Sequence, residues 1–264
     1  MAGKLQETAA ILANEQVAQG VWCMSVAAGG IAVRALPGQF VHVRAAENPV
    51  QFLRMPFAVY DVAPGASRLD ICYQVLGQGT QQLSQLACGH QLDLIGPIGN
   101  GWQVPEGTTR ALLVGGGVGT PALNLLARQL AGAGTAADAV IGAQTAARLC
   151  CADRIAANLE PVGGQVHVAT DDGSLGVHGF VTAISDGLIA SGAYDYLAVC
   201  GPTPMMRNVA RPALAAGVAC QVSMEKLMAC GVGACLSCVV ETTTGRKRCC
   251  VDGPVFDARE VVWQ

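Results

Sequence analysis

Cysteines near the C-terminus have the spacing of ligands to a two-iron cluster. Cys230, Cys235 and Cys238 form the pattern C-x4-C-x2-C, and a vicinal pair, Cys249 and Cys250, follows it. A [2Fe-2S] cluster needs four thiolates, of which the first three come from one loop short enough to curl around the irons. The spacing therefore predicts a protein that passes electrons one at a time, with Cys249 or Cys250 as the fourth ligand.

Two other interpretations of these cysteines stay open. Structural zinc sites usually pair two C-x2-4-C segments, and only Cys235 and Cys238 make one here. Free cysteines are also often small buried apolar residues, which would leave the spacing unexplained. Gly231 and Gly233 favour the cluster, because residues without a Cβ let backbone N–H groups approach its sulfides. Of the three interpretations of these cysteines, we favour an iron-sulfur cluster, then a zinc site, and last buried thiols without a metal.

The composition limits the architecture and the partners. The chain has 264 residues, enough for two packed domains and a small module. Only 13% of the residues are charged, and a surface so poor in charge is often covered in part by a partner. The net charge of -3, without a basic run, argues against a nucleic-acid partner. Glycines and polar residues interrupt the apolar stretches, so we expect no membrane span. The N-terminal segment lacks the apolar core of a signal peptide and the cysteines cluster around one motif, which together predict a cytoplasmic location.

The periodicity of hydrophobic residues changes along the chain. From about residue 18 to 100, apolar and polar residues alternate with period two between glycine-rich turns, which predicts a small antiparallel β-barrel. From Arg110 to about Cys220, the repeated order of strand, glycine turn and helix predicts an α/β domain with a parallel sheet. The predicted fold class is multidomain β plus α/β, with a barrel in residues 1–105, the α/β domain in 106–222 and a cluster module in 223–264. The N-terminal residues are expected to form a leading strand or a loose arm.

A glycine turn in the α/β region could receive a phosphate. The pattern predicts a buried strand over 111–114, then a helix over 121–130 with Thr120 as its N-cap. The turn between them holds glycines whose bare amides would meet the positive end of that helix: Gly115, Gly116, Gly117 and Gly119. A tight turn needs glycine for steric reasons alone, so this motif is weak by itself. A later predicted strand, 196–200, ends in Cys200-Gly201-Pro202, and ligands of such sheets bind at the carboxyl ends of strands. The two segments together predict a nucleotide site, with further strands at 139–142, 165–170 and 219–222.

The barrel region holds parts that suit a flavin dinucleotide. The segment Arg54-Met55-Pro56-Phe57-Ala58 supplies a cation for a pyrophosphate and an apolar surface for the ring system, and 77–80 supplies a flexible, amide-rich turn. Each part also has a purely structural interpretation, with Phe57 in a core and Arg54 on a solvated strand. Electron accounting favours the flavin, because a nicotinamide delivers two electrons as hydride and a [2Fe-2S] cluster accepts one. A carrier that exchanges both must lie between them.

Several segments resemble the electron-transfer subunit of class 1B dihydroorotate dehydrogenase, within the ferredoxin-reductase superfamily. The resemblance covers nearly the whole chain. The segments that carry it are 77–80 (GQGT), 92–101 (LDLIGPIGNG), 115–121 (GGGVGTP), 170–174 (TDDGS), 200–202 (CGP), 228–238 and 250–256 (CVDGPVF).

This resemblance implies FAD in the barrel, NAD(H) in the α/β domain and electron transfer through a [2Fe-2S] cluster to an FMN-containing catalytic subunit. It also implies a heterotetramer that serves pyrimidine biosynthesis. The implied flavin contacts are Met55, Pro56, Phe57, Ala58, Cys72, Tyr73, Gln74, Gly79 and Thr80. The implied cluster ligands are Cys230, Cys235, Cys238 and Cys250, and Cys200 resembles the superfamily cysteine beside the nicotinamide.

The chain departs from the family pattern at the flavin, where the family usually has Arg-Pro-x-Ser. Met55 stands at the arginine position and Ala58 at the serine position. Arg54 is therefore expected to reach the pyrophosphate, and a backbone N–H to replace the serine hydroxyl near flavin N5. Gln78 stands where the family often has lysine. Two alternatives follow: the same electron chain serving a paralogous oxidoreductase, or a zinc-stabilised interaction protein without catalytic activity.

Overall fold

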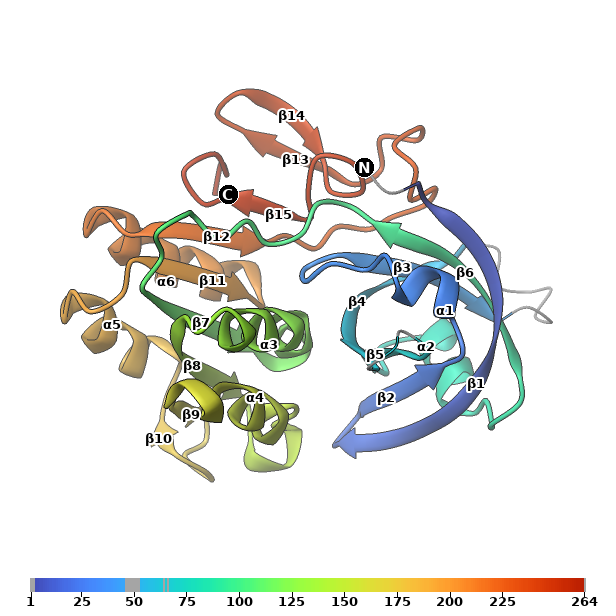
Figure 1. Ribbon diagram of the computed structural model, residues 1–264, viewed down its shortest axis with the longest axis horizontal. Coiled ribbons are helices and arrows are strands. Elements are labelled where there is room, and N and C mark those ends of the chain that lie inside the picture. Colours follow the sequence, from blue (N-terminus) through green and yellow to red (C-terminus); the bar gives the residue numbers. More distant parts are fainter. Residues whose placement is uncertain (1–2, 46–52, 64, 66, 264) are drawn as a thin grey trace.

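The computed structural model describes residues 3–45, 53–63, 65 and 67–263. A β-barrel and an α/β body lie side by side, and the C-terminal segment lies across one edge of both (Figure 1). Three clusters of buried hydrophobic residues correspond to the barrel interior and the two faces of the second sheet. The predicted combination of a barrel and an α/β body is confirmed.

The first body is a closed six-stranded antiparallel barrel with the strand order β1-β2-β5-β4-β3-β6. Its strands are β1 (Leu5–Ala18), β2 (Val21–Val26), β3 (Phe40–Ala45), β4 (Met55–Val62), β5 (Leu69–Gln74) and β6 (Gln91–Ile98). Closure leaves no free sheet edge, because β1 pairs with β2 on one side and β6 on the other. The N-terminal residues thus form the leading strand and not a loose arm.

Two short helices accompany the barrel: α1 (Gly29–Ala32) and α2 (Gln78–Ser84). The prediction of a flexible turn over 77–80 is wrong, because this segment begins α2. The Thr80 hydroxyl accepts hydrogen bonds from the N–H groups of Leu76 (2.9 Å) and Gly77 (3.2 Å), which fixes the chain at the start of the helix.

The second body contains a seven-stranded sheet with the order β10-β9-β8-β7-β11-β12-β15. Its strands are β7 (Arg110–Gly116), β8 (Ala136–Ala143), β9 (Val166–Thr170), β10 (Val177–His178), β11 (Tyr196–Cys200), β12 (Ala219–Ser223) and β15 (Val255–Asp257). All neighbours pair in parallel except β15, which pairs antiparallel with β12. The sheet order reverses at β7, whose two neighbours are β8 and β11, and this is where such sheets bind ligands.

Helices cover both faces of this sheet. The helices α3 (Asn124–Gly132) and α4 (Ala152–Leu159) pack on the face toward the barrel, and α5 (Thr182–Ala190) and α6 (Thr203–Ala215) pack on the other (Figure 1). Short 3-10 turns lie at Gly117–Leu123, Ala146–Arg148 and Glu160–Val162. In the part of the chain that the structure describes, no helix has the length and apolar character needed to cross a bilayer.

The predicted helix over 121–130 with Thr120 as its N-cap is wrong in its first turn. The chain leaves β7 in the 3-10 turn Gly117–Leu123, and α3 begins only at Asn124. Thr120 is 1% exposed, and a Cβ at Gly115 would lie 2.8 Å from its hydroxyl oxygen. Its side chain therefore packs against the strand and does not cap the helix.

The C-terminal segment adds the hairpin β13 (Val239–Thr242) and β14 (Gly245–Arg248) before β15 joins the large sheet. Buried residues of this segment, including Cys238, Cys249 and Phe256, share a core with Phe40 of the barrel and Val222 of β12. The segment is thus held against both larger bodies. The domain limits expected from the sequence stay predictions, and β15 belongs by its pairing to the α/β sheet.

Candidate functional site

The cysteine motif forms an irregular loop that the hairpin β13–β14 closes. Cys230 is half-buried, Cys235 is exposed, and Cys238 and Cys250 are buried. The Cys235 thiol affects the pKa of Cys230, and the thiols of Cys238 and Cys230 affect the pKa of Cys250. Four thiols near one another suit a two-iron cluster, which takes four protein ligands.

A tetrahedral zinc site needs four ligands around one point. Among the residues that the structure describes, no three His, Cys, Asp or Glu side chains are grouped closely enough to hold one metal ion. The expectation of iron before zinc continues to rest on the spacing of the cysteines.

Backbone N–H groups surround the first thiol. The N–H of Val232 donates to Cys230 Sγ at 3.4 Å. Burial raises the pKa of Cys230, but the N–H groups of Val232, Cys235 and Ala234 and the Cys235 thiol outweigh it and lower that pKa to about 6. The loop is thus arranged to stabilise a thiolate, the form that binds iron.

The two vicinal cysteines have different surroundings. Burial is the main cause that raises the pKa of Cys250 to about 11, and the thiols of Cys238 and Cys230 add to it. The N–H of Gly233 acts in the opposite direction and lowers this pKa. Burial likewise raises the pKa of Cys249 to about 12, and its backbone N–H donates to the Cys238 carbonyl at 2.9 Å. Only Cys250 is thus surrounded by the loop thiols and a loop amide, as a fourth ligand would be.

The barrel and its exit segment hold this loop in place. The side-chain amide of Asn100 donates to the carbonyls of Val251 (3.1 Å) and Asp252 (3.2 Å). Lys4 donates to the carbonyl of Gly231 at 3.2 Å, so both ends of the barrel chain contact the motif. The 92–101 segment noted in the sequence is therefore a support for the cluster loop.

The two predicted halves of the nucleotide site meet at the switch point of the sheet. Cys200 is the register partner of Gly115 on the adjacent strands β11 and β7. A Cβ at Gly119 would lie 2.7 Å from backbone atoms of Cys200 and Gly201, so glycine is required there by close packing. The remaining members of the predicted set, Gly116, Gly117, Thr120 and Pro202, lie on the same two segments.

Cys200 is suited to positioning and not to proton transfer. Its thiol is 9% exposed and its sulfur lies 4.0 Å from the Ser223 carbonyl. Burial raises the pKa of Cys200 to about 12, so the thiol is neutral at physiological pH.

The predicted flavin residues divide into available and engaged groups. Met55, Pro56, Phe57 and Ala58 are half-buried along β4 and offer apolar surface. The Tyr73 side chain is 1% exposed in the barrel core, where its hydroxyl donates to Asn14 at 2.9 Å and its ring contacts Phe57. A flavin could therefore reach Tyr73 only through its backbone. Of the others, Gln74 and Gly79 are half-buried, and Thr80 holds the start of α2.

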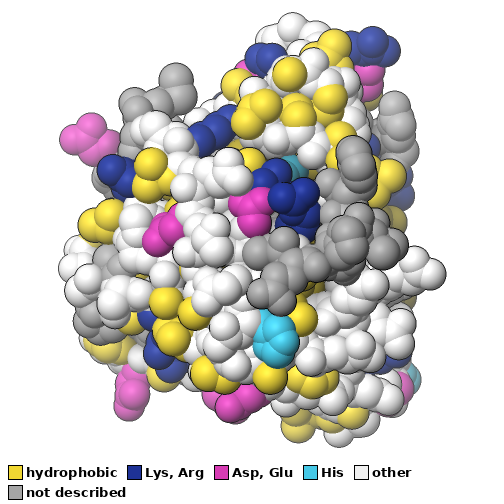
Figure 2. Space-filling model, turned by 90° about the vertical axis from the view of Figure 1, so that its right-hand side faces the viewer, with side chains coloured by type: hydrophobic (Ala, Val, Ile, Leu, Met, Phe, Trp, Pro, Cys, Tyr) yellow, Lys and Arg dark blue, Asp and Glu magenta, His cyan; other side chains and the backbone are white. Residues whose placement is uncertain are grey.

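The cation expected at the pyrophosphate is bound to a carboxylate. Arg54 forms an ion pair with Asp93, a buried residue that also pairs with Arg44 at 2.8 Å. On the barrel-side face, Lys and Arg side chains gather beside an acidic one (Figure 2). Two guanidinium groups share one carboxylate, which leaves a local charge of about +1 for an anion. The role of Arg54 toward a pyrophosphate stays a prediction.

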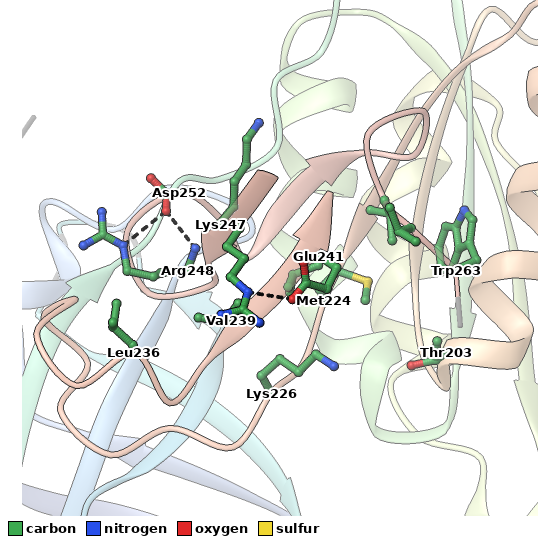
Figure 3. Close-up of a pocket in the computed structure, with 14 residues that line it drawn as sticks. Thr203, Met224, Lys226, Leu236, Val239, Glu241, Lys247, Arg248, Asp252 and Trp263 are labelled. Atoms are coloured by element: carbon green, nitrogen blue, oxygen red, sulfur yellow. Dashed lines mark hydrogen bonds and ion pairs between the residues drawn. The ribbon is translucent and has the colours of Figure 1, made fainter. Parts of the chain in front are cut away.

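The sequence did not indicate a pocket of about 770 Å³ between the hairpin and the start of α6 (Figure 3). Its lining comes from the cluster module and the chain end, and includes Lys226, Leu236, Arg246, Lys247, Arg248 and Trp263. Arg248 donates to Asp252 through its backbone N–H (2.7 Å) and its guanidinium (3.4 Å) at one end of this pocket (Figure 3). The three adjacent cations, Arg246, Lys247 and Arg248, are too few to count as a basic run, but they are the feature of the sequence that could have indicated it.

Comparisons with known proteins agree with this geometry. Residues 225–262 match the family model described as the iron-sulfur cluster binding domain of dihydroorotate dehydrogenase B. The chain is 41% identical over 237 residues to the dihydroorotate dehydrogenase B (NAD(+)) electron transfer subunit of Bacillus caldolyticus, covering 86% of each chain. It is 35% identical to the subunit of the same name from Desulforamulus reducens, covering 97% of this chain and 98% of that one.

Solved structures with the same fold are oxidoreductases. The structure of the NADH-dependent reduced ferredoxin-NADP oxidoreductase, a protein studied for flavin-based electron bifurcation, superposes with a TM-score of 0.86 at 32% identity. That match covers 100% of this chain and 92% of the other. The ferredoxin reductase of carbazole 1,9a-dioxygenase superposes with a TM-score of 0.69 at 21% identity, covering 81% of this chain and 67% of that one, and so shares the fold.

Proposed function

Because the chain belongs to the family of electron transfer subunits of dihydroorotate dehydrogenase B, we propose that it carries electrons between NAD(H) and an FMN-containing catalytic partner. The proposed carriers are FAD at the barrel and a [2Fe-2S] cluster in the C-terminal module. The observation that carries this proposal is the loop of the motif cysteines, in which the N–H of Val232 donates to Cys230 Sγ at 3.4 Å and Cys238 and Cys250 are buried.

Each group of residues has a proposed task. Cys230, Cys235, Cys238 and Cys250 hold the cluster, which exchanges one electron at a time when bound. The segments 115–120 and 200–202 bind the dinucleotide at the switch point, and the neutral Cys200 thiol orients the nicotinamide. Residues 55–58 and 72–74, with Gly79 and Thr80, bind the flavin, and Arg54 contributes charge near its pyrophosphate.

The partner completes the reaction. The oxidation of dihydroorotate, or its reverse, takes place on the catalytic subunit, in an assembly that we propose to be a cytoplasmic heterotetramer. The chain carries only 13% charged residues, and a face covered by a permanent partner accounts for that.

Anaerobic reconstitution tests the proposal. The purified chain should contain about two irons, with one FAD, and NADH should bleach the visible absorption of both. Addition of a bacterial FMN-containing dihydroorotate dehydrogenase B catalytic subunit should then give NADH-dependent reduction of orotate that neither chain gives alone. A folded protein that contains zinc without flavin, or one whose cluster NADH does not reduce, would overturn the proposal.

A second candidate is the same electron chain with another partner. The similarity to the reduced ferredoxin-NADP oxidoreductase extends over 100% of this chain, and Met55 and Ala58 depart from the usual flavin motif. In that case the iron, flavin and NADH results would be unchanged, but orotate would not be reduced. Co-purification from the native cell would then identify a different flavoprotein.

A further inference from the structure

Four cysteines gather between the barrel and the α/β body, away from the C-terminal motif. Cys23 on β2 and Cys72 on β5 are register partners on adjacent strands of the barrel. Cys72 Sγ lies 4.0 Å from Cys151 Sγ, although the two residues are 79 positions apart. Cys150 and Cys151 directly precede α4 in the α/β body. The cluster therefore spans the two bodies.

The members of this cluster differ in access and in ionisation. Cys72 and Cys150 are buried, whereas Cys151 is half-buried and reaches solvent. The neighbouring thiols of Cys150 and Cys72 lower the pKa of Cys151 to about 4, against the opposing effect of burial. The thiols of Cys151 and Cys23, together with burial, raise the pKa of Cys72. Cys151 is thus the member that holds a thiolate within reach of a small reagent.

The backbone keeps Cys151 in this position. Its φ of 65° lies in the left-handed region, which is uncommon for a residue with a side chain. The Cys150 sulfur donates to the Gly117 carbonyl at 3.7 Å, and its thiol also neighbours Cys151. Cys72 is the partner that the barrel offers, with its sulfur 4.0 Å from that of Cys151.

We propose that Cys72 and Cys151 form a redox-active dithiol that closes into a reversible disulfide between the barrel and the α/β body. The oxidant is a low-molecular-weight disulfide of the glutathione type. This site is separate from the proposed cluster ligands. It shares Cys72 with the proposed flavin contacts, but the exchange between the two thiols does not require a bound flavin.

The reaction proceeds in two thiol–disulfide exchanges. The Cys151 thiolate attacks one sulfur of oxidised glutathione, forms a mixed disulfide and releases one glutathione thiolate. The Cys72 sulfur then attacks Cys151 Sγ, the bond from Cys151 to glutathione breaks, and the second glutathione leaves with the proton of the Cys72 thiol. Two protein thiols are oxidised while one glutathione disulfide is reduced to two thiols. The sulfurs must approach from 4.0 Å to about 2 Å, which side-chain rotation and a small shift of the domains can supply.

The disulfide would place the redox state of these two thiols next to the proposed flavin contacts. Cys72 stands on β5 among the proposed flavin contacts, and Cys151 begins α4 on the face of the sheet toward the barrel. A covalent bond between them would fix the two bodies relative to one another. Closing a loop of this length raises the melting temperature by about 5–10 °C in a chain of this size.

Redox equilibration of the purified full chain tests the inference. The protein is incubated without oxygen at set ratios of reduced to oxidised glutathione, trapped with N-ethylmaleimide and analysed by peptide mass spectrometry and thermal melting. We expect a Cys72–Cys151 peptide in most chains at the oxidising end, a higher melting temperature, and reversal of both by dithiothreitol. Cys88→Ser, which changes an exposed cysteine, should behave like the unaltered chain.

Two different substitutions at Cys151 guard against the case in which one of them prevents folding. Cys151→Ser should lose the cross-link and the temperature shift, and so should Cys151→Gly, which suits the left-handed backbone. Linkage of Cys72 to Cys23, a bond between Cys150 and Cys151, or free Cys72 and Cys151 at every ratio would overturn the inference.

Discussion

Cys249 and Cys250 are neighbours in the chain and both are 0% exposed, yet their thiols have different surroundings. Cys250 stands among Cys238, Cys230 and the N–H of Gly233, whereas the carbonyl of Cys238 receives the backbone N–H of Cys249. A ligand must direct its sulfur toward the other ligands. Position relative to the loop, and not burial, therefore distinguishes the two residues.

We expect Cys250→Ala to remove the cluster and Cys249→Ala to retain it. The first change deletes one of four thiolates, so iron content should fall below half and the visible and paramagnetic signals of the cluster should be lost. The second leaves a small cavity that costs about 1 kcal/mol of stability. Iron analysis and electron paramagnetic resonance of the two variants, prepared side by side, make the measurement. The reverse pattern would assign the fourth ligand to Cys249.

Strands were easier to predict than the turns that join them. The strand Tyr196–Cys200 was predicted to the residue, because its five side chains are all buried and form one apolar run. The start of α3 was missed, because Thr120 and Pro121 are typical of a helix start while their burial against Gly115 depends on contacts distant in sequence. At this position, tertiary packing overrides the local preference of these residues for a helix start.

The candidate site residues stay predictions, and the strongest of them depend on spacing along the chain. The cysteine motif and the two glycine segments are local patterns, and the fold places Gly115 beside Cys200 on adjacent strands. The engagement of Arg54 by Asp93 and of Tyr73 by Asn14 was not predictable, because both partners come from distant strands. For the same reason, the contact between Cys72 and Cys151 could not be predicted from the sequence.

The cluster loop has little room at Gly231. Its φ is 65°, and a Cβ there would lie 2.8 Å from Nδ1 of the buried His42. Gly231→Ala should therefore displace the loop and lower iron content at least twofold. Gly20→Ala is the matched control, because Gly20 has a φ of 73° and no atom within 4 Å of the added Cβ. Both variants carry a backbone strain of about 1 kcal/mol. Equal iron content in the two variants would show that the His42 side chain moves to accommodate the methyl group and that the loop is not displaced.

The two bodies of the molecule are joined around one buried carboxylate. Asp61, at the end of β4, accepts hydrogen bonds from Arg128 at 2.6 Å and Arg154 at 2.7 Å, which lie on α3 and α4. Next to it, Asn124 donates to the Tyr60 carbonyl at 3.0 Å. Electron transfer between a barrel-bound flavin and a sheet-bound nicotinamide requires a fixed separation of these bodies, and this contact helps to fix it.

Asp61→Asn should weaken that junction far more than loss of an exposed ion pair. The carboxylate is 2% exposed and takes two charged partners, so its removal should cost about 1–3 kcal/mol. For a chain of this length that lowers the melting temperature by about 2–6 °C. Glu241→Gln breaks the exposed pair with Arg246, 2.9 Å long, and should cost less than about 1 kcal/mol. Calorimetry on both variants, with equal flavin and iron loading, makes the comparison. Equal shifts would mean that Asp61 contributes no more than a surface ion pair and that other contacts, such as the hydrogen bond from Asn124 to Tyr60, hold the barrel against the sheet.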